Sequence, residues 1–215
     1  NRALVAFACL LLGIASAFVG CGGGSDSSTG SSSGTAQSQP APPKSDFPSA
    51  TGKTLAEVLE AEAAQPSKLV VSPAAMTFYK GENRYPFGVF QRDRTQVTDA
   101  KVALYFAKVP GKAGAPGSTE SSATNPKTAE RALDQPAVGP FPAAIESLQT
   151  KPAFRAQTTA SDPDAASVVY ATHVDFPGDG QWRIASLIRQ GNELTPTLLP
   201  SAEVGKFAKV PRVGE

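Results

Sequence analysis

The side chains best suited to chemistry in this sequence are its single histidine, His173, and its single methionine, Met76. Asp175 stands two positions after the histidine. Imidazole, thioether and carboxylate groups bind copper or zinc, although a stable site needs three or four ligands. A copper-handling site using His173 and Met76 is therefore one hypothesis. The alternative is an exposed histidine on a strand, which we favour, so no metal ligand and no cofactor are predicted.

The sequence does not gather groups for acid–base or nucleophilic catalysis. Its Asp and Glu residues are scattered among predicted turns, with no pair spaced for proton transfer. Residues 30–34, GSSSG, match a nucleophile elbow by letter, but Gly and Ser residues flank them instead of a strand and a helix. Gly52-Lys53-Thr54 matches the end of a phosphate-binding loop, but Phe47 stands where that loop needs glycine. The sequence predicts no enzyme.

The positions of the cysteines indicate an exported protein. An uncharged apolar run, residues 3–19, follows Arg2 and ends just before Cys21. Its length suits the apolar region of a secretory signal better than a membrane-spanning helix. The only other cysteine, Cys9, lies inside the run, so a chain processed at Cys21 would hold no disulfide.

The residues around the second cysteine, Phe18-Val19-Gly20-Cys21, resemble the lipobox of bacterial lipoproteins. There a small residue directly precedes the cysteine that is lipidated and becomes the first residue. Phe18 departs from the leucine usual at its position. The resemblance implies that residues 1–20 are a lipoprotein signal peptide and that a lipid on Cys21 anchors the protein at the extracytoplasmic face of the cell membrane. The alternatives are a cleaved secretory signal with an incidental cysteine, or an uncleaved anchor.

The charge of the chain after Cys21 is balanced, and its first residues are of low complexity. The chain has 20 basic and 19 acidic residues, and Arg2 is the only charged residue before Cys21, so a processed chain would be neutral. No cluster of Lys and Arg could track a phosphate backbone, so nucleic acid is not a predicted partner. Residues 21–52 are rich in Gly, Ser and Pro and are predicted to form a disordered tether.

A short amphipathic helix is predicted over residues 53–66. Thr54 and Glu57 have the spacing of a capping box, and Pro66 ends the run. The apolar stripe consists of Leu55, Val58 and Leu59. Such a short helix is marginal alone, so we expect it to cover an edge or end of a sheet.

From residue 67 onward the apolar period is two, which indicates strands. The clearest are residues 168–176 and 181–189, expected to form an antiparallel hairpin about a turn at 177–180. The predicted inward residues are Tyr170, Thr172, Val174 and Phe176 in the first arm, and Trp182, Ile184, Ser186 and Ile188 in the second. Roughly seven or eight short strands without alternating helices predict an all-β, antiparallel β-sandwich over residues 67–205.

Other features of the sandwich are predicted from local sequence. The further strands are expected at 68–71, 75–79, 84–90, 97–108, 154–159 and 194–199, with a turn at 81–83. Pro86 argues for an edge strand or a bulge. Residues 110–138 are predicted to be a disordered insertion because they are poor in aromatic and β-branched residues. Core positions are expected after it at Phe141, Ile145, Leu148 and Phe154.

Three stretches carry a second resemblance: GENRYPFGVF at 81–90, GPFPA at 139–143 and the expected hairpin. Together they resemble the immunoglobulin-like module that precedes a thioredoxin-like domain in some bacterial lipoproteins, over roughly residues 68–205. This implies a non-catalytic, membrane-tethered module that binds a protein partner or presents a neighbouring domain. Residues 206–215 are similar to the linker into the second domain. The alternative is therefore the front portion of a thioredoxin-like redox lipoprotein, which a Cys-x-x-Cys beyond Glu215 would establish.

Overall fold

The computed structural model describes residues 37–60, 68–111, 130–150, 152–154 and 165–206, which all belong to one compact unit. Their helices include the α-helix α1 (Leu55–Glu60) and two short 3-10 helices, η1 (Lys44–Asp46) and η3 (Pro152–Phe154). The strands are β1 (Leu69–Pro73), β2 (Thr77–Phe78), β3 (Gly81–Gln91), β4 (Lys101–Lys108), β5 (Val138–Pro142), β6 (Ala144–Ser147), β7 (Val168–Phe176), β8 (Gly180–Gln190) and β9 (Glu193–Val204).

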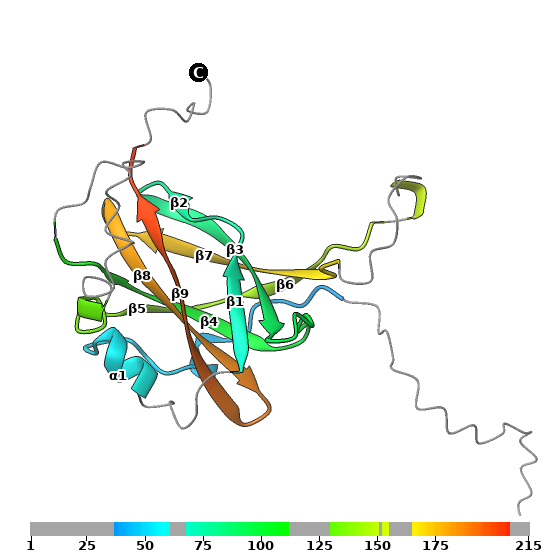
Figure 1. The fold of residues 1–215 in the computed structure, drawn as a ribbon, viewed down its shortest axis with the longest axis horizontal. Helices are drawn as coiled ribbons and strands as arrows, with labels where there is room; N and C mark the ends of the chain where they lie inside the picture. Colours follow the sequence, from blue (N-terminus) through cyan, green and yellow to red (C-terminus); the bar gives the residue numbers. More distant parts are fainter. Residues whose placement is uncertain (1–36, 61–67, 112–129, 151, 155–164, 207–215) are drawn as a thin grey trace, which may run out of the picture. The chain divides into compact units, whose positions relative to one another are not determined.

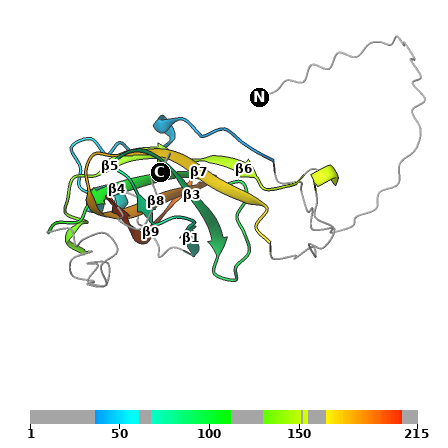
Figure 2. The same ribbon diagram turned by 90° about the horizontal axis from the view of Figure 1, so that it is seen from above.

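The strands form two sheets that pack as a β-sandwich (Figures 1 and 2). The four-stranded sheet has the order β1-β3-β7-β6, and the five-stranded sheet has the order β2-β9-β8-β4-β5. Neighbouring strands are antiparallel except β2 and β9, which pair in parallel. The predicted all-β sandwich is confirmed.

Alternate residues of the long strands fill the space between the sheets. The predicted inward residues of β7 and β8 are all buried, and Trp182 is only 3% exposed. β3 and β4 contribute their own buried series: Tyr85, Phe87 and Val89, and Val102, Leu104 and Phe106. The face assignments made from the period of two are therefore confirmed.

The predicted hairpin between β7 and β8 is wrong. β7 pairs with β3 and β6, whereas β8 pairs with β4 and β9. Residues 177–179 carry the chain from one sheet to the other. The prediction failed because alternation reports which face of a strand is buried and not which strand lies beside it. Two strands that face each other across a sandwich have the same pattern as two neighbours.

β3 also differs from expectation, because it is an inner strand and includes the predicted turn at 81–83. The main-chain groups of Pro86 face β1, since the Ala74 N–H donates to the Pro86 carbonyl at 2.9 Å. The ladder between β1 and β3 ends at Pro73, opposite Phe87. The position where Pro86 lacks an N–H therefore lies just past the end of that ladder. No carbonyl of β1 loses a hydrogen bond because of the proline.

The structure corrects the predicted tether for residues 37–52. Residues 37–50, which we call the strap, lie along the sandwich. Gln39 and Ile145 exchange two main-chain hydrogen bonds of 2.8 and 2.9 Å. Asp46 accepts a side-chain bond from Lys101 at 2.8 Å, and Phe47 is 5% exposed. Composition predicted disorder here because the apolar and ionic contacts lie far away in sequence. Residues 21–36 lie outside the described residues.

The predicted helix has the expected cap, but it docks on the outer face of a sheet and not on an edge or end. The Thr54 N–H donates to Glu57 Oε2 at 2.7 Å, and the Glu57 N–H donates to Thr54 Oγ1 at 3.2 Å. The Thr54 hydroxyl also donates to Glu57 Oε2, at 3.2 Å. The two bonds that this carboxylate accepts, led by the one from the Thr54 backbone, lower the pKa of the Glu57 carboxyl. Leu55 and Val58 are fully buried, and they belong to a cluster with Tyr105 and other residues on the outer face of the five-stranded sheet. Residues 61–66 lie outside the described part.

The predicted disordered insertion is also shorter than expected. Residues 130–137 cover the start of α1, where the N–H groups of Leu55 and Ala56 donate to the carbonyls of Gln135 and Leu133 at 3.0 and 2.8 Å. They thus satisfy helix N–H groups that have no partner inside the helix. The chain then enters β5, so the disorder prediction was wrong for 130–138. Residues 112–129 are not among those described.

Two of the four core positions expected after the insertion are wrong. Ile145 is buried and Phe141 is partly buried against the core. Leu148 and Phe154 are 49% and 75% exposed, because each follows the end of the pairing that continues the sheet. The expected strand at 154–159 lies mostly outside the described residues, and Phe154 itself belongs to η3.

Candidate binding groove

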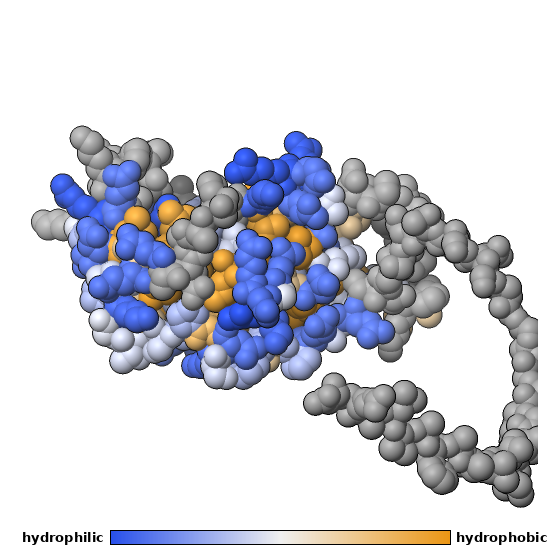
Figure 3. Space-filling view, turned by 90° about the horizontal axis from the view of Figure 1, so that it is seen from below, coloured by the Kyte–Doolittle hydropathy of each residue, from blue (hydrophilic) through white to orange (hydrophobic). Residues whose placement is uncertain are grey.

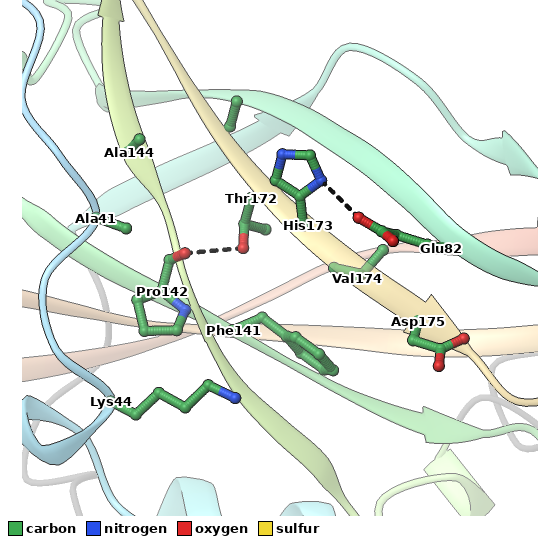
Figure 4. Close-up of a pocket in the computed structure, with 11 residues that line it drawn as sticks. Ala41, Lys44, Glu82, Phe141, Pro142, Ala144, Thr172, His173, Val174 and Asp175 are labelled. Carbon is green, nitrogen blue, oxygen red and sulfur yellow. Dashed lines mark hydrogen bonds and ion pairs between the residues drawn. The ribbon is translucent and has the colours of Figure 1, made fainter.

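A groove of about 400 Å³ opens at the edge of the sandwich where the chain passes from β5 to β6 (Figure 4). Its walls come from the strap, from β5 and β6, from β7, and from the start of β3. The chain leaves the five-stranded sheet after Pro142 and joins the four-stranded sheet at Ala144. This change of sheet separates the two sheet edges and creates the groove.

One wall is the open part of β7. β6 pairs with β7 only between Val168 and Ala171. Beyond Ala171, no described strand pairs with β7 on this side. The hydroxyl of Thr172 donates to the carbonyl of Pro142 at 2.8 Å and ties the start of the open part to the end of β5.

The hydrogen bonds between β6 and β7 show which main-chain groups of β7 face the groove. The Leu148 N–H donates to the Ser167 carbonyl at 2.9 Å, so odd-numbered residues of this strand face β6. Because main-chain groups alternate sides along a strand, the N–H and C=O groups of His173 and Asp175 face the open side. Such groups can bond to an added strand.

The acidic side of the groove lies on the outer face of the four-stranded sheet. Glu82 of β3 lies directly opposite Asp175 of β7, in a pair whose main-chain groups point away from each other. Side chains are closest in pairs of this type. Glu82 Oε1 also lies 3.2 Å from His173 Nδ1, and both side chains are largely exposed. Two carboxylates therefore share this side of the groove.

The remaining walls carry apolar groups and one cation. Phe141 packs edge-on against the core ring of Phe106, with ring centres 5.4 Å apart. Its other side is partly exposed toward the groove. Figure 4 shows Lys44, from η1, across the groove from Glu82 and Asp175, with Phe141 between the two sides. The groove is thus apolar in the middle, acidic on one side and basic on the other.

The sequence-based candidates fall in separate places. His173 lies on the exposed face of β7 as expected, whereas Met76 lies just before β2, in the other sheet, and is 47% exposed. Within the described ranges, no three or more His, Cys, Asp or Glu residues are grouped to hold a metal ion. Cys21 lies outside these ranges. Trp182 packs against Phe176 in the core, as predicted, with ring centres 5.8 Å apart.

The groove itself was not predicted from the sequence. Lys44, Glu82 and Asp175 come from three distant segments, and only the fold brings them together. The available signal was Pro142, which ends β5 two residues before β6 begins in the other sheet. On the face shown in Figure 3, apolar residues form several patches separated by hydrophilic residues. Scattered exposed apolar residues are normal for a soluble domain, so the groove is the stronger candidate.

Comparison with known proteins gives no information on the function of this chain, so the function is argued from its residues. No protein-family model matches the chain, and neither a curated protein nor a solved structure matches it. In the described part of the chain, no helix has both the length and the apolar character needed to cross a membrane.

Proposed function

We propose that this chain is a lipid-anchored lipoprotein of the extracytoplasmic membrane face, whose sandwich is an immunoglobulin-like module that binds a protein partner. The lipobox-like residues ending at Cys21 support the anchor. The observation that carries the binding role is the groove beside the open part of β7. It combines unpaired strand groups, an apolar middle and charges of both signs, and such groups hold a ligand by complementarity.

The first test concerns the anchor. The wild-type protein is expected to partition into the detergent phase, and Cys21→Ala is expected to move it to the aqueous phase, because the lipid chain is attached to the cysteine sulfur. Cys9→Ala is the matched control and should partition like the wild type, since Cys9 lies inside the predicted signal peptide. Detergent partitioning of a Cys21→Ala protein that has lost its signal peptide would contradict lipid anchoring.

The second test concerns the groove in intact cells. A photo-cross-linking amino acid placed at Lys44, on the groove wall, is expected to form a covalent adduct with a specific protein. The same amino acid at Lys68, which is exposed beside β1 at the other end of the four-stranded sheet, is the matched control. Mass spectrometry should identify a partner from Lys44 that Lys68 does not capture. Equal capture at both positions would contradict a binding role for the groove.

A further inference from the structure

We propose that the groove binds its partner as an extended peptide, which adds to β7 as a strand and places a Lys or Arg side chain beside Asp175, with Glu82 on the next strand. This inference rests on the proposed function and specifies the ligand of the same groove. It begins with the main chain. His173 and Asp175 direct their N–H and C=O groups toward the open side, where a strand about 4.8 Å away would complete the ladder.

The strap directs an incoming strand to β7. On the far side of β6, Gln39 already bonds to Ile145, and the Ser147 N–H donates to Ser38 Oγ at 3.0 Å. That edge of β6 is therefore occupied by the chain itself. The open part of β7 continues the same sheet beyond the start of β6, so an added strand there would lie in line with β6.

Charge determines which peptide fits. The side chains of an added strand alternate between the two faces of the sheet. Those on the outer face lie beside Asp175, and Glu82 stands directly opposite Asp175 on the next strand, β3, so the two carboxylates add their negative charge there. Those on the inner face point toward Phe141. A basic residue followed by an apolar residue is the pattern that satisfies both faces, and Lys44 on the opposite wall repels a basic side chain placed in the wrong register.

The main-chain part of this proposal is tested with the full-length protein and a labelled peptide of sequence Val-Arg-Val-Arg-Val, blocked at both ends. N-methylation of the amides on the edge facing β7 removes hydrogen bonds and is expected to weaken binding about tenfold. N-methylation of the amides on the other edge is the matched control. Hydrogen exchange at the His173 and Asp175 amides is expected to slow when the unmodified peptide binds.

The proposed preference for a basic peptide is tested with variants of the groove. Glu82→Gln combined with Asp175→Asn is expected to weaken binding of the Arg peptide about three- to tenfold, as loss of exposed ion pairs should. Glu193→Gln combined with Asp134→Asn, at exposed positions outside the groove, is the charge-matched control and should bind like the wild type. Replacing both Arg residues of the peptide by Glu should abolish the effect of the double variant and lower the affinity.

The outcomes separate this inference from the function on which it rests. A partner cross-linked from Lys44, together with peptides that bind equally well whichever edge is methylated, would overturn strand addition and leave the binding function in place. Preference for the Glu peptide would overturn the basic ligand. Failure of the unmodified peptide to bind would overturn the whole inference. Absence of a specific cross-link from Lys44 would count against the groove itself.

Discussion

Replacing Trp182 by alanine is expected to lower the free energy of unfolding by about 3–5 kcal/mol. The side chain is 3% exposed, its ring centre lies 5.8 Å from that of Phe176, and its indole N–H donates to the Gly178 carbonyl at 3.0 Å. Truncation therefore leaves a cavity between the sheets and a carbonyl without its donor. For a domain stable by about 5–15 kcal/mol, the loss should be visible as a large shift in the chemical denaturation midpoint.

The neighbouring residue provides the control. Arg183 faces the outer side of the five-stranded sheet, where partial burial lowers the pKa of its guanidinium. Its Nε atom is buried and has no hydrogen-bond partner among the described residues, so removing the side chain also removes a desolvation cost. Arg183→Ala is expected to change stability by about 0.5 kcal/mol or less. Equal losses at Trp182 and Arg183 would contradict the register of β8.

Removing one hydroxyl group is expected to have opposite effects at two buried tyrosines. The Tyr170 hydroxyl donates to the Val97 carbonyl at 2.9 Å and accepts from the Ala100 N–H at 3.2 Å. The Tyr85 hydroxyl is buried and has no partner in the described part of the chain. Tyr170→Phe should therefore lower the free energy of unfolding by about 1–3 kcal/mol, whereas Tyr85→Phe should raise it by about 1–2 kcal/mol.

These two substitutions are well matched because both rings are fully buried and stacked. Tyr85 lies on Phe78 with ring centres 5.0 Å apart, and Tyr170 lies on Phe87 at 5.5 Å. Burial is also the main cause that raises the pKa of both phenols above the ordinary value. The difference between the variants therefore isolates the hydrogen bonds. Urea denaturation measures both, and a loss of stability at both positions would show that Tyr85 has a partner in the native state.

The sequence was most informative about which side of each strand is buried. Alternation placed Trp182 and Tyr170 inside and His173 outside, because the side-chain period of a strand does not depend on its neighbours. It could not reveal that β7 and β8 lie in different sheets. Strand pairing depends on the path of the chain between strands, and the turn at 177–180 has residues that suit either a hairpin or a crossing between sheets.

Composition was least informative about segments that are held in place by contacts with residues distant in sequence. The strap has the Pro and Ser content of a linker, yet Phe47 is buried and Asp46 contacts both Lys101 and Arg189. The groove was missed for the same reason. His173 and Asp175 could be placed on an exposed face, but their proximity to Lys44 depends on how the strap lies across the sandwich.

The strap has a mechanical consequence if, as proposed, the protein is anchored through Cys21. Tension on the N-terminal chain would act first on the hydrogen bond between Ser38 and Ser147, and then on the two between Gln39 and Ile145. It would reach the Asp46–Lys101 ion pair and the buried Phe47 only after these had parted. Peeling residues 37–46 from the sandwich would lengthen the chain before the domain by up to about 34 Å, at roughly 3.4 Å per extended residue. The strap would thus release chain length before any strand is pulled out of its sheet.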